Sequence, residues 1–139
     1  MSKHPDFLQM INLASEKLGA RALRCSDDFF APMENLLKPG RGIFIADKYT
    51  DRGKWMDGWE SRRKRGPGHD WCIIKLGTAG IIRGLDVDTN HFLGNHPPYC
   101  SVEACVLQGE DIEAAEWNEI LVKSHLNPGS QHYFEIFND

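Results

Sequence analysis

The sequence lacks long apolar runs and paired cysteines. No stretch approaches the about 20 apolar residues that span a bilayer, and the opening MSKHPDFLQM is too polar for a secretory signal. We therefore expect a cytoplasmic protein with no membrane partner. Cysteines 25, 72, 100 and 105 form no CxxC pair, which argues against structural zinc and, in that compartment, against disulfides. Cys72 and Cys105 lie in apolar runs and are expected to be buried thiols.

The motifs of the commonest enzyme classes are also missing. The sequence contains no HExxH, GxGxxG, phosphate-binding P-loop or GxSxG, so no organic cofactor is expected. The formal net charge is -4, which argues against nucleic acid as a partner. The basic run 62–65 (RRKR) is short and is flanked by Glu60 and Asp70, so it does not change this expectation.

What the sequence does contain indicates a small, mainly β domain. Its 139 residues are 41% apolar, which is enough for one core. Apolar runs separated by Gly, Pro and Asn turns favour an antiparallel β-sandwich or jelly roll. The expected strands are 43–46, 71–76, 80–88, 99–107, 117–122 and 131–137. Residues 6–18 are expected to form a short helix ending at Gly19, or an irregular apolar arm.

Polar chemistry is concentrated between Lys54 and Asn95. The stretch 48–70 has no regular period, and a loop of this length in a compact domain is usually functional or disordered. Its tryptophans argue against disorder. Within it, residues 57–63 (DGWESRR) bring together Asp57, Trp59, Glu60 and two arginines. An arginine can hold a carboxylate ligand through two parallel hydrogen bonds, and Glu60 or Asp57 could act as a base or accept N–H groups. A solvated loop with internal ion pairs explains the same composition.

Two further groups are candidates for proton transfer or metal binding. His69 precedes Asp70 and Trp71 at a loop–strand junction, where a carboxylate can orient an imidazole for acid–base work. It could equally bond only to the loop. Asp86 and Asp88 share one strand face, and His91 follows in a stretch that ends at Asn95. These three could hold a divalent metal, form a polar ligand wall, or make up a solvent-facing acidic edge.

Taken in order, several motifs resemble one family. They are NLASxxLG (12–19), DDFFAPxENLLKPGRG (27–42), FIADKYTDRGKWMDGWESRRKR (44–65), GHDWCIIKLG (68–77), GLDVDTNHFLGNxP (84–97), SVEAC (101–105), WNEIL (117–121) and LNPGSQHYFEI (126–136). Together they are similar to the allantoicase (allantoate amidinohydrolase) family, from about Asn12 to Ile136. The combination of DGWESRR, HDW and DVDTxHFxGN is the most specific part of the resemblance.

The resemblance implies a jelly-roll β-sandwich related to galactose-binding-like domains, with two similar repeats and homo-oligomers in the full-length protein. It also implies hydrolysis of allantoate to ureidoglycolate and urea in purine breakdown, by an enzyme acting on C–N bonds other than peptide bonds. Residues 1–139 correspond to the first repeat only, and we expect its last strand or two to be absent.

A mechanism for that substrate can be assigned from chemistry. Arg62 or Arg63 would bind the allantoate carboxylate, while Glu60, Asp86 or Asp88 would accept ureido N–H groups. His69 and His91 are the acid–base candidates, with Glu60 and Asp70 as the other expected catalytic carboxylates. Substrate contacts are also expected from Asp57, Trp59, Trp71 and Asn95, the two indoles excluding water. Asp86, Asp88 and His91 remain candidate ligands of a divalent metal. The alternative function for the whole chain is a non-catalytic ligand-binding or assembly module.

Overall fold

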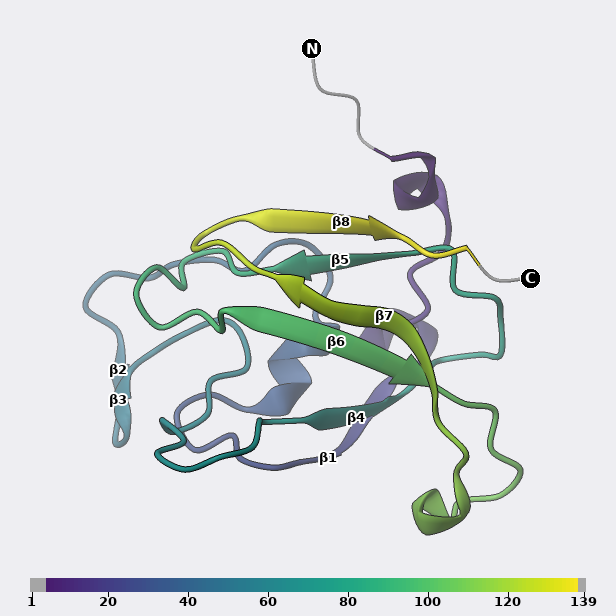
Figure 1. The fold of residues 1–139 in the computed structure, drawn as a ribbon. Coiled ribbons are helices and arrows are strands. Elements are labelled where there is room, and N and C mark those ends of the chain that lie inside the picture. The colour runs from purple at the N-terminus through teal and green to yellow at the C-terminus, as the bar shows by residue number, and fades with distance from the viewer. Residues whose placement is uncertain (1–4, 138–139) are drawn as a thin grey trace. The chain divides into compact units, whose positions relative to one another are not determined.

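The computed structural model describes residues 5–137, and within that range it is mainly β, as the sequence predicts (Figure 1). The helical elements in this range are 3-10 helices: η1 (Asp6–Gln9), η2 (Glu16–Leu18), η3 (Met33–Leu37) and η4 (Ile112–Ala114). The strands are β1 (Arg21–Cys25), β2 (Tyr49–Thr50), β3 (Gly53–Lys54), β4 (Cys72–Lys75), β5 (Gly84–Asp88), β6 (Tyr99–Ala104), β7 (Asn118–His125) and β8 (Gln131–Glu135).

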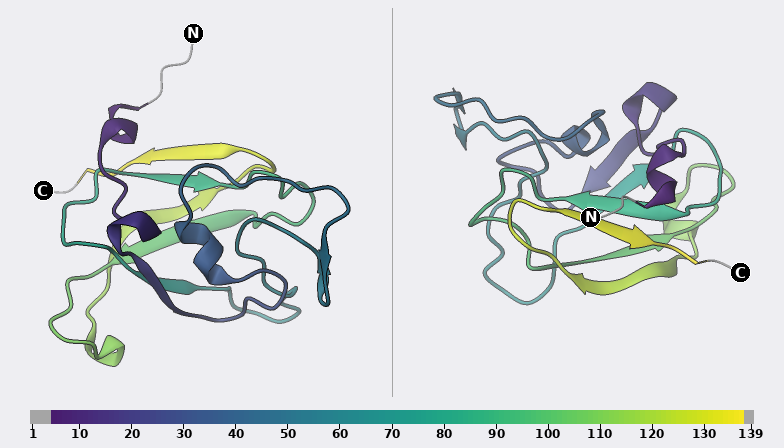
Figure 2. Two further views of the ribbon diagram at one scale, coloured as in Figure 1. Left: turned by 180° about the vertical axis from the view of Figure 1, so that it is seen from behind. Right: turned by 90° about the horizontal axis from the view of Figure 1, so that it is seen from above.

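The chain divides into two compact units, each with its own antiparallel strand pairs. One unit holds the described residues up to Gln9 and those from Ile82 onward, and the other holds Met10–Ile81. The pairs β5–β8 and β6–β7 belong to the first unit, and β1–β4 and β2–β3 to the second. The ribbon views show the partners of each pair side by side (Figure 2).

In the unit Met10–Ile81, β1 and β4 pair over the register Arg21–Lys75 to Cys25–Cys72, with an irregularity at residue 23. The 3-10 helix η3 packs on β1. Met33, its first residue, donates its backbone N–H to the carboxylate of Asp28 at 3.1 Å. This bond fixes the turn between β1 and η3, because it satisfies a backbone donor that a short helix leaves open.

In the other unit, the buried Thr89 fastens the β5–β8 pair at one end. Thr89 is 4% exposed, and its hydroxyl donates to the carbonyl of Asn127 at 2.6 Å while accepting the N–H of Ser130 at 3.0 Å. Beside it, the His132 ring bonds to the Val87 carbonyl through Nδ1 and accepts the Asn127 N–H at Nε2, both at 2.8 Å. These bonds hold the 127–130 turn against β5 without any charged group.

The N-terminal segment takes the irregular-arm form rather than one continuous helix. It contains only the two short turns η1 and η2, which fall in different units. Gly19 ends η2 in the left-handed conformation, at φ 101°, as expected of a glycine cap. The apolar residues of 6–18 are partly exposed, and Ile11 is 75% exposed, so no apolar stripe is packed in a way that would sustain a longer helix.

The strand expected at 43–46 is wrong, and three short strands were not expected. Residues 43–46 lack strand structure, because no neighbouring strand pairs with them and their backbone is held instead by Asp57. Ile43 donates its N–H to the Asp57 carboxylate at 2.8 Å. The strands β1, β2 and β3 lie in polar or short stretches whose pairing depends on distant partners. The other expected strands occur as β4 to β8 with shifted ends.

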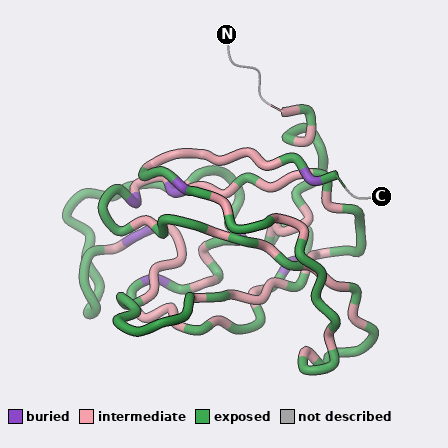
Figure 3. The backbone as a smooth tube through the Cα atoms, viewed as in Figure 1, coloured by how far each residue is buried: buried purple, intermediate pink, exposed green. Residues whose placement is uncertain are grey.

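The two cores are small, as the burial map shows (Figure 3). Buried apolar residues are Ala20, Ala31, Leu37 and Met56 in one unit, and Phe92, Leu126 and Ile136 in the other. Large apolar side chains are also exposed, including Val106 at 91% and Phe137 at 87%. Contrary to expectation, Cys72 and Cys105 are only half-buried. No helix among the described residues is long and apolar enough to cross a membrane.

Candidate functional site

The loop that carries the basic run 62–65 is fixed to the end of β1 by Asp27. The Asp27 carboxylate accepts the backbone N–H of Arg62 at 2.7 Å, and it accepts the guanidinium Nε and Nη2 at 3.1 and 2.8 Å. These bonds hold the pKa of Asp27 below its usual value and raise the pKa of Arg62. The guanidinium also lies over the ring of Phe29. Arg62 is thus already occupied by a carboxylate within the protein.

Two backbone contacts place the rest of this loop. Ala31 and Glu60 exchange backbone hydrogen bonds at 3.1 Å in an isolated antiparallel bridge. The Trp59 indole donates Nε1–H to the Asp27 carbonyl at 2.7 Å. The segment 59–62 therefore lies along 27–31, and Trp59 serves this attachment.

Asp70 connects the other side of the loop to the end of β1. Its carboxylate accepts the hydroxyl protons of Ser26 and Ser61, each at 2.9 Å. Ser26 in turn accepts the backbone N–H of Trp71 at 2.9 Å and donates its own backbone N–H to the Trp71 carbonyl. The β1–β4 pairing thus continues by one residue pair, Ser26 and Trp71, past the ends of the two strands. This places Asp70 beside Ser26.

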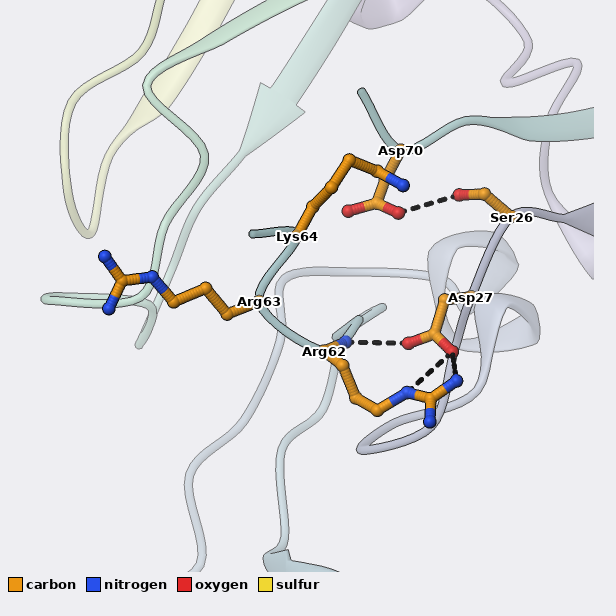
Figure 4. A pocket seen from close by; sticks show the side chains of 6 residues that line it. All are labelled: Ser26, Asp27, Arg62, Arg63, Lys64 and Asp70. Atoms are coloured by element: carbon orange, nitrogen blue, oxygen red, sulfur yellow. Dashed lines mark hydrogen bonds and ion pairs between the residues drawn. The ribbon is translucent and has the colours of Figure 1, made fainter. Parts of the chain in front are cut away.

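A hollow of about 370 Å³, open to solvent, lies between these attachments in the unit Met10–Ile81. Its lining residues are Ser26, Asp27, Arg62, Arg63, Lys64 and Asp70. In the close view, the Arg62 side chain folds back to Asp27, whereas Arg63 extends in the opposite direction (Figure 4). Within residues 5–137 neither Arg63 nor Lys64 forms an ion pair. The hollow therefore offers two unpaired cations for an anion and, at Asp70 and Ser26, polar oxygens for N–H groups.

The other predicted site residues of this unit do not line the hollow. Asp57 accepts the backbone N–H of Ile43 and lies 3.4 Å from the Lys38 ammonium, so it holds the loop around 38–43. Gly42 is required there, because a Cβ at this position would lie 2.7 Å from the Asp57 carbonyl oxygen. His69 is exposed, and both Asp70 oxygens are bonded to serines rather than to its ring. Trp71 is 42% exposed.

The predicted site residues from 86 to 95 lie in the other unit. Asp86 accepts the side-chain N–H of Gln131 at 3.0 Å, and Asp88 accepts the backbone N–H of Asn90 at 2.9 Å. His91 has a left-handed backbone, at φ 70°, and Asn95 is exposed. Across residues 5–137 no three His, Cys, Asp or Glu side chains gather closely enough to hold a metal ion. The metal expectation at Asp86, Asp88 and His91 is therefore not supported by the donor geometry.

Sequence reasoning missed several residues that shape the hollow. Asp27, Ser26 and Ser61 lie in motifs that pointed to the family but were not assigned to the site. Their signal was the pair Asp27–Asp28 directly before Phe29–Phe30, which offers carboxylates to the arginines of another loop. Lys64 was treated only as part of a basic run, although it lines the hollow.

Comparisons with known proteins agree with this mainly β fold. The family model described as Allantoicase repeat matches residues 11–139. The chain is 53% identical over 133 residues to a probable allantoicase of Burkholderia mallei, covering 94% of this chain and 40% of that protein. It is 49% identical over 128 residues to a probable allantoicase of Acinetobacter baumannii, with coverages of 92% and 38%.

Solved structures show the same likeness. A structure described as that of allantoicase matches with a TM-score of 0.77 at 34% identity, covering 91% of this chain and 38% of that one. An allantoicase of Saccharomyces cerevisiae matches with a TM-score of 0.75 at 36% identity, with coverages of 93% and 41%. The chain thus spans about two fifths of the length of these relatives.

The fold and the hollow define a mainly β domain with an open pocket lined by charged side chains. The chain belongs to the allantoicase family, because the family model matches nearly all of it. The resemblance predicted from the sequence motifs is thereby confirmed.

Proposed function

We propose that this chain is the first repeat of an allantoicase, which hydrolyses allantoate to ureidoglycolate and urea. Family membership over residues 11–139 carries the proposal, and the hollow supplies chemistry suited to the substrate. Allantoate is a small anion that carries one carboxylate and two ureido groups. The cations Arg63 and Lys64 match the carboxylate, while Asp70 and Ser26 match ureido N–H groups.

The proposed roles of the two arginines differ. Arg63 binds the substrate carboxylate, because its guanidinium extends away from Asp27 and has no ion pair in residues 5–137. Arg62 positions the loop, because Asp27 accepts three of its N–H groups. Lys64 adds positive charge at the same hollow. This division refines the expectation that either arginine could hold the substrate.

The reaction needs one water and one proton transfer in each direction. At the central carbon, which is saturated, water displaces one ureido group: the C–O bond forms at the expense of the C–N bond, whose electron pair leaves with the ureido nitrogen, and the water loses a proton to a base. That nitrogen takes a proton and departs as urea. His69, His91 and Glu60 are the proposed acid–base groups, with substrate contacts from Asp57, Trp59, Trp71, Asp86, Asp88 and Asn95 retained as proposals.

The finer description of the fold is part of the same proposal. Eight strands in antiparallel pairs within the described residues support a jelly-roll β-sandwich of the galactose-binding-like type. Exposed apolar side chains such as Val106 and Phe137 support further covering by another repeat or by another copy in a homo-oligomer. A cytoplasmic location stays a prediction.

The decisive experiment measures urea release from allantoate by two proteins. One is the 139-residue chain, and the other is a chimera in which this chain replaces its counterpart in the Burkholderia mallei relative. The proposal expects urea and ureidoglycolate in equal amounts from the chimera, with loss of this activity in Asp70→Ala. A chimera that folds cooperatively, binds allantoate and releases no urea would overturn it and would favour a ligand-binding module.

A further inference from the structure

Three sulfur-containing residues, Cys25, Cys72 and Met33, meet where η3 packs on the β1–β4 pair. Cys25 and Cys72 are direct partners in the strand register, and the Cys72 Sγ lies 3.9 Å from the Sδ of Met33. Met33 begins η3, which packs on β1. All three side chains are half-buried, so the cluster is neither sealed in the core nor open on the surface.

The register places the two thiols close together. The next pair along, Ser26 and Trp71, is joined by a backbone hydrogen bond of 2.9 Å. Hydrogen-bonded and non-hydrogen-bonded pairs alternate in an antiparallel ladder, so Cys25 and Cys72 form a non-hydrogen-bonded pair. In such pairs the Cα atoms are only about 4.5 Å apart, and both side chains project from the same face.

The spacing of the sulfurs suits a trigonal metal centre. Metal–thiolate bonds are about 2.3 Å long, so three sulfurs placed evenly around one ion would be about 4.0 Å apart. The measured separation between Cys72 and Met33 is 3.9 Å. Two thiols and a thioether form a soft donor set, which selects copper(I) over harder ions. Zinc would require a fourth ligand in a structural site, and no third Cys or His joins this group in the described chain.

We propose that Cys25, Cys72 and Met33 form a binding site for a single copper(I) ion. The ion replaces the two thiol protons, which pass to solvent, and the Met33 thioether completes a three-coordinate centre. Cys25 adjoins Ser26, and Cys72 follows Trp71. The ion would therefore join the ends of β1 and β4 where they lead into the hollow.

Copper(I) titration of the full 139-residue chain, without oxygen and against a chromophoric copper(I) chelator, tests the site. We expect one ion per chain held at least about 100-fold more tightly than in Cys25→Ser or Cys72→Ser, and a loss of about tenfold in Met33→Leu. Cys105→Ser and Met10→Leu are matched controls that should bind as the parent does. Circular dichroism of each variant separates loss of the site from loss of the fold.

X-ray absorption on the copper-loaded chain provides a second measurement. Three sulfur neighbours at about 2.3 Å in the parent, falling to two in Met33→Leu, would support the trigonal site. The proposal is overturned if folded Cys25→Ser retains the parent affinity, or if zinc binds as tightly as copper(I). None of these outcomes depends on allantoate hydrolysis.

Discussion

Asp27 holds Arg62 at three points, through its backbone N–H and through two guanidinium nitrogens. This relationship joins the end of β1 to a loop 35 residues further along the chain. It also occupies the guanidinium of Arg62, whereas its neighbour Arg63 forms no ion pair in residues 5–137. The attachment therefore distinguishes two arginines that are adjacent in the sequence.

Replacing Asp27 by Asn should lower thermal stability at neutral pH and loosen the 59–62 segment. Because the pKa of Asp27 is lowered in the folded chain, relative to an ordinary value of 3.8, its stabilisation is present above about pH 4 and is lost as the pH falls through the lower folded pKa. Thermal melts from pH 7 to pH 3 should therefore show parent and Asp27→Asn converging at acid pH. Asp51→Asn, in an exposed turn, is the control. A constant difference across this pH range would contradict the assignment.

Arg63→Gln should weaken substrate binding in the active chimera, raising KM by about ten- to 100-fold with kcat largely kept. Loss of a hydrogen bond to a charged partner costs about 1.5–3 kcal/mol, and a contact made equally in ground and transition states affects KM alone. The matched control is Arg65→Gln, which removes the same charge two residues away, outside the lining. Steady-state urea release checks both. Equal effects in the two variants would show that only the overall positive charge matters.

Thr89→Val should destabilise the chain by about 1–3 kcal/mol, because a buried backbone donor and acceptor lose their shared hydroxyl. The side chain keeps its volume, so the cost reports the bonds to Asn127 and Ser130 rather than a cavity. Urea denaturation measures the free energy of unfolding. Thr78→Val, at an exposed position, should change it little. A loss below about 0.5 kcal/mol would mean that water replaces the hydroxyl.

The Cys72 thiol should react slowly with iodoacetamide in the metal-free folded chain. Burial raises its pKa from 9.0 to about 11, so the thiolate fraction at neutral pH falls by about 100-fold. Its rate should rise about tenfold for each pH unit toward pH 11. Mass spectrometry of peptides containing Cys72, from folded and urea-unfolded chains, gives the ratio of rates. Equal rates at pH 8 would show that the thiol is not shielded.

The sequence predicted the strands that carry their own periodicity and missed those defined only by their partners. β5 alternates apolar and polar residues, whereas β1 pairs with β4 despite an exposed, Arg-containing pattern. For the site, the sequence indicated Arg62 and Arg63, because guanidinium groups suit anion recognition. It indicated Asp70 because this carboxylate directly follows His69. It could not indicate that Asp27 occupies Arg62, since this contact depends on the tertiary path of two loops.

The register of the β5–β8 pair has a consequence for biosynthesis. β5 ends at Asp88 and its partner begins at Gln131, 43 residues later. At translation rates of about 5–20 residues per second, β5 waits for roughly 2–9 s before β8 is made. During that interval Leu85 and Val87 have no ladder partner, and the ribosome-bound chain carries an open strand edge. Cotranslational chaperone capture should therefore be strongest on nascent chains that end between these two strands.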